Sequence, residues 1–302
     1  MTLVERAIEK MRRTAAAKDG GALAAVGSLV QDRPAGTPEG SPSATPPARR
    51  IHIDSVALRD AGYLPESSRD RQFAGHYRLI KRPLIARAQA AVAGPTIASP
   101  RLIMMASALP GDGKTFTSIN LALSMARERD ISVLLVDADV PKPHVSRIFG
   151  VEREPGLLDA LLDSNMDVES LVLPTDIGSL SILPAGNSHE GATELIASAR
   201  MAAIVTRLIS QNPRRVVLFD TPPLLVSSES RALAAIAGQV VMVVRAGSTP
   251  QNAVLDAIEL VGENKEVSLI LNEGRVGLTG GYYGYGEYGS YDGADSPADE
   301  GR

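Results

Sequence analysis

Apolar and polar positions alternate along most of the chain in a way that predicts strands and helices in turn. From residue 101 onward, short apolar runs typical of buried strands occur at 102–106, 132–137, 180–184, 215–219, 239–244 and 267–271. Between them lie amphipathic segments typical of helices, at 114–128, 191–210, 229–236 and 252–263. This alternation predicts an α/β fold with a mostly parallel sheet and helices on both of its faces.

The first hundred residues follow a different pattern, and we divide the chain accordingly. Residues 1–20 are expected to form an amphipathic helix, residues 21–66 to be a disordered linker, and residues 67–276 to form the α/β domain. The linker prediction rests on the stretch 31–50, which is rich in Pro, Gly, Ser and Thr. Such a stretch cannot bury enough apolar surface to offset the entropy lost on ordering. Residues 277–302 are expected to be a flexible tail, because their many glycines disfavour a helix or a packed strand.

Two helical patterns precede the α/β domain. The N-terminal amphipathic helix can dock on a partner protein or pack on its own domain, and the sequence leaves both open. A membrane-surface helix is less favoured, because the apolar face is short and has no aromatic anchor. Residues 67–92 predict two helical pieces interrupted at Pro83, since proline lacks the N–H that a helix interior needs. The basic residues of this region predict a solvent-exposed helix face: Arg78, Lys81, Arg82 and Arg87.

The clearest chemical signal is a glycine-containing loop between the first strand and the helix that follows it. It reads Ala108-Leu109-Pro110-Gly111-Asp112-Gly113-Lys114-Thr115. Strand, glycine loop, Lys-Thr and helix form the pattern of a P-loop, whose backbone N–H groups and helix N-terminus bind phosphate. Lys114 is expected to reach the β- and γ-phosphates of ATP, and the Thr115 hydroxyl to hold Mg²⁺. The predicted nucleotide-binding residues of this segment are Pro110, Gly111, Asp112, Gly113, Lys114, Thr115 and Phe116.

Three later strands end in polar residues, where parallel sheets of this class bind their ligands. Asp220 suits the role of a Walker B carboxylate that holds Mg²⁺. Asp137 and Asp139 are candidates to complete the Mg²⁺ ligands and to accept a proton from an attacking hydroxyl. Asn272 is predicted to contact the adenine edge, although a turn-forming Asn explains it equally well. The predicted catalytic residues are therefore Lys114, Asp137, Asp139 and Asp220, and the predicted metal ligands are Thr115, Asp137 and Asp220.

Composition narrows the class of function. A net charge of −4 over 302 residues gives no sign of a nucleic-acid-binding surface, and the absence of cysteine excludes disulfides and Cys-based metal sites. The sequence shows no long apolar run and no apolar signal core, so we expect a cytoplasmic protein. Five of the seven tyrosines lie together in the tail, as Tyr282, Tyr283, Tyr285, Tyr288 and Tyr291. Their hydroxyls are potential phosphate acceptors.

These motifs resemble those of the bacterial tyrosine kinases (BY-kinases), over roughly residues 75 to 291. The P-loop is similar to the family's Walker A, Leu134-Leu135-Val136-Asp137-Ala138-Asp139 to its Walker A′, and Leu218-Phe219-Asp220-Thr221-Pro222-Pro223 to its Walker B. The tail resembles the family's C-terminal tyrosine cluster. Three segments further resemble the stand-alone autokinases of exosortase-associated exopolysaccharide loci: 77–84, 183–186, and 192–195 leading to Arg200 and Met201.

The resemblance implies an ATP- and Mg²⁺-dependent protein-tyrosine autokinase that phosphorylates its tail tyrosines in trans. It also implies a regulator of exopolysaccharide polymerisation or export, recruited to the inner face of the cell membrane. The implied partners are a transmembrane activator of the polysaccharide chain-length-determinant type, a cognate tyrosine phosphatase, and further copies of the chain in a homo-oligomer. Nucleic acid is not among them.

Two positions depart from the family pattern. The family's Walker A′ continues Asp-x-Asp-x-Arg, but Pro141 stands at the Arg position here, with Lys142 beside it. The oligomerisation motif Glu-x-x-Arg-x-x-Arg falls on Gly75, Arg78 and Lys81, so its acidic member is missing.

Two alternative functions stay open on the sequence. A Min/Par-type partitioning ATPase would release phosphate rather than form phosphotyrosine, but Leu109 stands where that group carries an extra lysine. The tail also has no use in such an ATPase. A nucleotide-gated adaptor with weak catalysis is the second alternative, and the proline at position 141 is the feature that suggests it.

Overall fold

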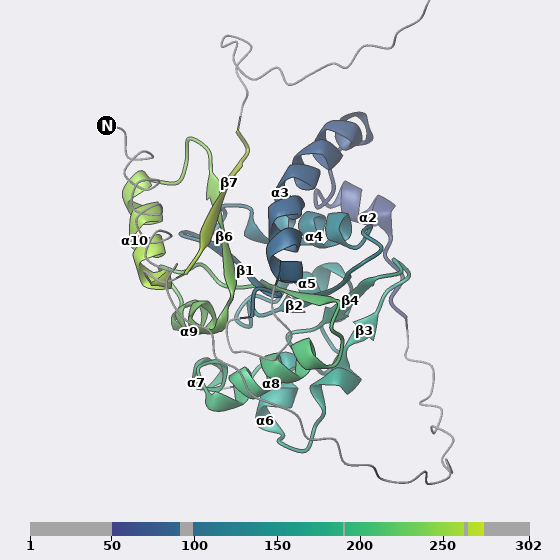
Figure 1. Ribbon diagram of the computed structural model, residues 1–302, viewed down its shortest axis with the longest axis vertical. Coiled ribbons are helices and arrows are strands. Elements are labelled where there is room, and N and C mark those ends of the chain that lie inside the picture. Colours follow the sequence, from purple (N-terminus) through teal and green to yellow (C-terminus); the bar gives the residue numbers. More distant parts are fainter. Residues whose placement is uncertain (1–49, 91–98, 190, 263–264, 275–302) are drawn as a thin grey trace, which may run out of the picture. The chain divides into compact units, whose positions relative to one another are not determined.

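The computed structural model describes residues 50–90, 99–189, 191–262 and 265–274 (Figure 1). The predicted N-terminal helix, most of the predicted linker and the tyrosine-rich segment 277–302 lie outside these residues. The strands are β1 (Leu102–Ser107), β2 (Ser132–Asp137), β3 (Leu173–Pro174), β4 (Leu180–Leu183), β5 (Arg215–Asp220), β6 (Gln239–Arg245) and β7 (Val267–Asn272). The helices are α2 (Ser55–Asp60), α3 (Asp70–Ala90), α4 (Lys114–Met125), α5 (His144–Ile148), α6 (Leu157–Leu162), α7 (Ala192–Ile196), α8 (Ala199–Ser210), α9 (Ser228–Ile236) and α10 (Gln251–Val261), with short 3₁₀ turns at Ser67–Arg69 and Val168–Leu171.

The described strands form one sheet in the order β3-β4-β2-β5-β1-β6-β7. All neighbours pair in parallel except β3 and β4. This arrangement confirms the predicted α/β fold with a mostly parallel sheet. The carboxyl ends of β1, β2 and β5 lie side by side in its centre, so the P-loop and the strand-end acids are brought to one edge.

Helices cover both faces of the sheet, as predicted (Figure 1). Alternate residues of each central strand point to opposite faces. In β1, Ile103 and Met105 pack with α3, α4 and α5, whereas Leu102, Met104 and Ala106 pack with α6 through α10. All six residues of β1 are buried, which is why the strand reads as a continuous apolar run.

Three predictions about helices were wrong in detail. The segment 67–92 does not break at Pro83, because α3 continues through it. Residues on both sides of the proline, Tyr77 and Leu84, are buried, and their packing holds the helix together. The segment 191–210 is two helices, since Ser198 between them has extended backbone angles. Helices α5 and α6 were not predicted at all, because each is shorter than the periodicity of an amphipathic helix can reveal.

The predicted linker was too long at its C-terminal end. Residues 50–66 are structured: Ile51 bridges to Thr175 beside β3, and Ile53 and Leu58 are buried in the core. The Asp54 side chain caps α2 by accepting the N–H groups of Val56 and Ala57. Among the described helices, none is long and apolar enough to cross a membrane.

Candidate active site

The P-loop connects β1 to α4 through two glycines in the left-handed region. Gly111 has φ +87° and Gly113 has φ +89°, a conformation that side chains disfavour. Gly113 is also the N-cap of α4 and offers no side-chain acceptor to the first N–H groups of the helix. Those N–H groups are therefore free to bind an anion, as the sequence pattern predicts.

Asp112 fixes the shape of this loop from within. Its carboxylate is buried and accepts hydrogen bonds from the N–H of Leu109 (3.1 Å) and the hydroxyl of Thr249 (2.6 Å). Its backbone carbonyl accepts the amide Nδ2 of Asn272 (3.0 Å). A Cβ on Gly113 would lie 2.0 Å from that amide nitrogen, so the glycine also makes room for Asn272. Asp112 and Asn272 thus hold the loop, a role that the sequence did not reveal.

The carboxylate of Asp220 interacts with three donor side chains from α4. Its fully buried carboxylate lies 3.3 Å from the Lys114 ammonium and accepts the hydroxyls of Thr115 (2.8 Å) and Ser118 (2.9 Å). Lys114 and Thr115 were predicted to act here, and Ser118 was missed. Its position one helical turn after Lys114, on the same face of α4, is the signal that could have identified it.

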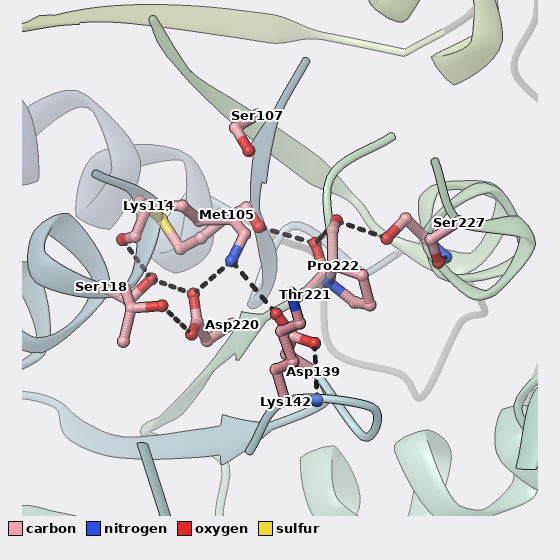
Figure 2. A network of polar contacts seen from close by, with 12 residues as sticks. Met105, Ser107, Lys114, Ser118, Asp139, Lys142, Asp220, Thr221, Pro222 and Ser227 are labelled. Atoms are coloured by element: carbon pink, nitrogen blue, oxygen red, sulfur yellow. Dashed lines mark hydrogen bonds and ion pairs between the residues drawn. The ribbon is translucent and has the colours of Figure 1, made fainter. Parts of the chain in front are cut away.

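Lys114 also points toward Asp139, which follows the end of β2 (Figure 2). Its Nζ lies 3.9 Å from Oδ2 of Asp139, whose other oxygen accepts the backbone N–H of Lys142 at 3.3 Å. Burial raises the pKa of Asp139 above its ordinary value, although the Lys114 charge opposes this. The lysine therefore bridges the ends of β2 and β5 in the structure.

Asp137 lies deeper, at the end of β2. Its Oδ2 accepts both the N–H and the hydroxyl of Ser146, each at 2.7 Å, while its buried Oδ1 has no hydrogen-bond partner. Burial and the nearby charge of Asp220 raise the pKa of Asp137 to about 7. Nothing in the sequence marked Ser146, because it belongs to the short helix α5 that the pattern did not predict. An unpaired carboxylate oxygen beside a phosphate-binding loop fits a water or hydrated cation.

A cavity of about 500 Å³ opens over the P-loop. The predicted residues that line it are Pro110, Gly111, Asp112, Gly113, Lys114, Thr115, Phe116 and Asp139. Asp137, Asp220 and Asn272 are not among its lining residues. The structure thus brings every predicted site residue of the described chain to this region, with Asp137 and Asp220 behind the cavity wall. The five tail tyrosines lie outside the described residues.

The cavity also has lining residues that the sequence reasoning did not assign to it. Tyr63 comes from the segment that was predicted to be linker, and His144 from α5. Glu229, on α9, accepts hydrogen bonds from Ser227 and Thr193. Lys142 lines the cavity beside the proline that replaces the family's arginine. No spacing in the sequence connects these residues to the P-loop.

Comparison with known proteins defines the class first. Residues 100–269, more than half of the chain, match the AAA domain family, so the chain belongs to this family of P-loop nucleotide-binding domains. Tyrosine-protein kinase YwqD of Bacillus subtilis is 31% identical over 192 residues, which cover 63% of this chain and 78% of that protein. The chain therefore belongs, more particularly, to the bacterial tyrosine kinase family.

Longer relatives and solved structures agree with this placement. The putative tyrosine-protein kinase EpsB of Ralstonia solanacearum is 37% identical over 148 residues, which are 49% of this chain but 19% of that protein. The chain spans only about a fifth to a quarter of the length of such relatives. The crystal structure of the VpsO kinase domain superposes with a TM-score of 0.52 at 30% identity, covering 65% of this chain and 98% of that chain. The kinase domain of Escherichia coli tyrosine kinase ETK gives 0.52 at 26% identity, covering 61% and 72%.

Proposed function

We propose that this protein is an ATP-dependent protein-tyrosine autokinase that phosphorylates its own tail tyrosines in trans and thereby regulates exopolysaccharide polymerisation or export. The observation that carries the proposal is the convergence of Lys114, Thr115 and Ser118 on Asp220, beside a P-loop, in a chain of the bacterial tyrosine kinase family. Phosphoryl transfer needs positioning and charge stabilisation more than covalent chemistry from the protein, and this constellation supplies both.

The side chains have separate roles in this proposal. The N–H groups of the loop and the ammonium of Lys114 bind the phosphates of ATP, and Thr115, Asp137 and Asp220 would hold Mg²⁺ directly or through water. When bound, the ion would neutralise negative charge on the phosphates. In the described residues no group of three or more His or acidic side chains is placed to hold a metal by itself. This suits Mg²⁺, which retains waters and shares its coordination with phosphate oxygens.

Asp139 is the proposed proton acceptor for the attacking tyrosine hydroxyl. It lines the cavity, whereas Asp137 lies behind it with Ser146 on one oxygen. The side-chain amide of Asn272 donates a hydrogen bond to the backbone carbonyl of Asp112 in the structure. It would have to break this bond to donate to adenine, as the sequence predicted. We therefore assign its main contribution to holding the loop.

The partner proposals rest on the relatives. The chimerical protein CapA2B2 superposes with a TM-score of 0.55 at 25% identity, and the succinoglycan biosynthesis transport protein ExoP of Rhizobium meliloti is 30% identical over 200 residues. We propose a transmembrane chain-length-determinant protein as activator, a cognate tyrosine phosphatase, and a homo-oligomer at the inner face of the membrane.

The proposed oligomer differs from the family pattern in one respect. Lys81 is buried, contrary to the predicted exposed helix face, and its ammonium bonds to the carboxylate of Glu128 (2.7 Å) and the carbonyl of Ser124 (2.6 Å). It therefore ties α3 to α4 within one chain. Exposed Arg78 is the member of the motif that stays available for a second copy.

The test is intact-mass spectrometry of the purified full chain before and after incubation with Mg·ATP, and again after a tyrosine phosphatase. We expect a ladder of phosphate additions that maps to residues 282–291 and disappears in Lys114→Met. Lys265→Met makes the same chemical change outside the cavity and should keep the ladder. Far-UV circular dichroism must show Lys114→Met folded, because its ammonium lies between two buried carboxylates.

Other outcomes point to the alternative functions. Phosphate release from ATP without phosphotyrosine would favour a partitioning-type ATPase. Binding of ATP with neither product, even with the cytoplasmic segment of a candidate membrane partner, would favour the nucleotide-gated adaptor. A ladder that persists in folded Lys114→Met would contradict the assignment of this site.

A further inference from the structure

A second cavity, of about 430 Å³, lies between α2, α3 and the C-terminal half of α4. Among the described residues, it shares no lining residue with the cavity over the P-loop, and no motif in the sequence marks it. Its volume is within the range of ligand pockets, about 300–1,000 Å³. We call it the α3–α4 cavity, and the lining residues that matter here are Arg59, Asp70, Arg71, Phe73, Tyr77 and Arg127.

Positive charge dominates the lining of this cavity. Its three arginines, Arg59, Arg71 and Arg127, come from α2, from the first turn of α3 and from the residues after α4. Asp70 is the only acidic residue among the described lining residues. Arg59 neutralises it, because Nη1 and Nη2 lie 2.9 Å and 3.3 Å from its two carboxylate oxygens. The side chains of Arg71 and Arg127 are exposed and have no ion-pair or hydrogen-bond partner in the part of the chain that the structure describes. Two arginines are therefore available to an anionic ligand.

The remaining lining is aromatic and aliphatic. Tyr77 is only 7% exposed, and its ring centroid lies 5.9 Å from that of Phe73. Its hydroxyl bonds to the side chain of Thr117 on α4, so Tyr77 is held by two helices. Leu123 and Ile177 add aliphatic surface. Rings and aliphatic groups beside two unpaired guanidinium groups suit a ligand that has an aromatic body and an anionic end.

Hydrogen bonds fix the walls of the α3–α4 cavity. Helices α3 and α4 lie side by side (Figure 1). In the turn that connects α2 to α3, Arg59 donates to the carbonyl of Pro65. The carbonyl of Tyr63, in the same turn, accepts the side-chain amide of Asn120 on α4 at 2.8 Å. A cavity whose walls are held in this way loses little conformational entropy when a ligand binds.

The proposed kinase would itself produce a ligand of this chemistry. A phosphotyrosine side chain joins an aromatic ring to a phosphate group that carries a charge of about −1.5 to −2 at pH 7. Four of the five tail tyrosines have a glycine as a neighbour, which leaves room for the side chain to enter a cavity. Glu287 and Asp292 stand next to Tyr288 and Tyr291 and add negative charge. Inorganic phosphate, by contrast, has no ring to contact the aromatic lining.

We propose that the α3–α4 cavity binds phosphotyrosine of a phosphorylated tail; this rests on the proposed kinase function. Arg71 and Arg127 bond to the phosphate, for which arginine has the matching planar geometry, and Phe73 and Tyr77 contact the ring. Phe73 also packs edge to face on Phe116, with ring centroids 5.9 Å apart, and Phe116 lines the P-loop cavity. The two cavities are therefore separated by a single pair of aromatic rings on this side.

The test measures the binding of a synthetic peptide, so it needs no kinase activity. The protein is the full chain with all five tail tyrosines changed to Phe, which prevents its own tail from competing. The probe is a fluorescein-labelled peptide of residues 284–292 with phosphotyrosine at position 288, followed by fluorescence anisotropy. Saturating Mg·ADP occupies the P-loop cavity throughout. We expect this peptide to bind at least about tenfold more tightly than the unphosphorylated peptide or the same peptide with phosphoserine at position 288.

Substitutions locate the binding site on the protein. Arg71→Gln and Arg127→Gln should each weaken binding by about tenfold, because each removes a charge-assisted hydrogen bond to phosphate. Arg129→Gln is the matched control, since Arg129 is exposed two positions after Arg127 but does not line the cavity. It should change the affinity by less than about twofold. Inorganic phosphate at the same concentration as the peptide should not displace it.

The results that would overturn the proposal concern either the ligand or the site. Equal affinity for the phosphorylated and unphosphorylated peptides, for the phosphotyrosine and phosphoserine peptides, or for the peptide and inorganic phosphate would contradict the ligand. Equal losses in Arg127→Gln and Arg129→Gln would indicate general attraction to surface charge and contradict the site. Binding that disappears when Mg·ADP is added would place the peptide in the P-loop cavity instead.

Failure of this proposal and failure of the kinase function can be told apart. The ladder of tail phosphorylation is measured on the wild-type chain without the peptide, so a ladder without peptide binding contradicts only the phosphotyrosine site. Peptide binding that depends on Arg71 and Arg127 in a chain that forms no ladder contradicts the kinase function and supports the phosphotyrosine site.

Discussion

Replacing Asp112 by alanine should loosen the phosphate-binding loop and lower the stability of the protein together. The carboxylate is 4% exposed and satisfies two donors, the N–H of Leu109 and the hydroxyl of Thr249. Hydrogen bonds to a charged group each contribute about 1.5–3 kcal/mol. Because the variant also removes the desolvation cost of a buried charge, we expect a loss of about 2–3 kcal/mol in the free energy of unfolding.

The Thr249 contact can be isolated with a double-mutant cycle. Thr249→Val keeps the shape of the side chain but leaves Oδ1 of Asp112 without its 2.6 Å donor, which should cost about 1–3 kcal/mol. In the double variant the second change should cost less than it does alone, because the shared bond is already gone and only the bond from the N–H of Leu109 or from the N–H of Arg245 remains to be lost. The expected coupling energy is at least about 1 kcal/mol, within the range for residues in contact.

Urea unfolding followed by far-UV circular dichroism is the assay, because the chain has no Trp for fluorescence. Exposed Asp256 on α10 provides the matched control, and Asp256→Ala should change stability by less than about 0.5 kcal/mol. Nucleotide affinity, measured in parallel, should fall for Asp112→Ala and stay unchanged for the control. A coupling energy below about 0.5 kcal/mol would refute the idea that Asp112 anchors the loop through Thr249.

Two further predictions concern buried positions. Since the folded-state pKa of Asp137 is raised from 3.8 to about 7, its proton stabilises the nucleotide-free protein at acid pH, and that stabilisation is lost as pH rises through this window. Asp137→Asn should therefore gain stability relative to wild type by a few kcal/mol between pH 4 and pH 7.5 in urea titrations; a pH-independent difference would contradict the raised pKa. Gly156→Ala should destabilise by about 1–3 kcal/mol in the same assay, because its Cβ would lie 2.1 Å from the carbonyl oxygen of Pro184. Gly178→Ala, with no atom within 4 Å of its Cβ, should not, and equal losses would contradict the packing argument.

The sheet could be predicted because its central strands are buried on both faces. Burial on both faces requires apolar residues at nearly every position, and such runs are visible in β1, β2, β5 and β6. The two-residue strand β3 and the short helices α5 and α6 carry no comparable pattern. They form because neighbours hold them: the N–H of Leu157 at the start of α6 bonds to the carbonyl of Pro184 after β4.

The residues of the candidate active site divide in the same way. That Lys114, Thr115 and the strand-end acids lie close together could be predicted, because each follows a strand within a local sequence motif. Ser146 could not, since it meets Asp137 only when α5 folds back on β2. The contact by which Asp112 holds the loop could not be predicted for a related reason: its partner Thr249 is 137 positions away in the chain.

The sequence by itself determined the main parallel strands, the longer helices between them, the P-loop and the acids that follow two of the strands, because these depend on residue type and short spacings. Only the tertiary structure decided that residues 50–66 return to the P-loop helix, where the carbonyl of Tyr63 accepts the side-chain amide of Asn120. It also decided that Lys81 is buried in an ion pair rather than exposed on a helix face. Both outcomes depend on contacts between segments that are far apart in the sequence. The free energy of these contacts comes from burial and hydrogen bonding, which a local sequence pattern cannot reveal.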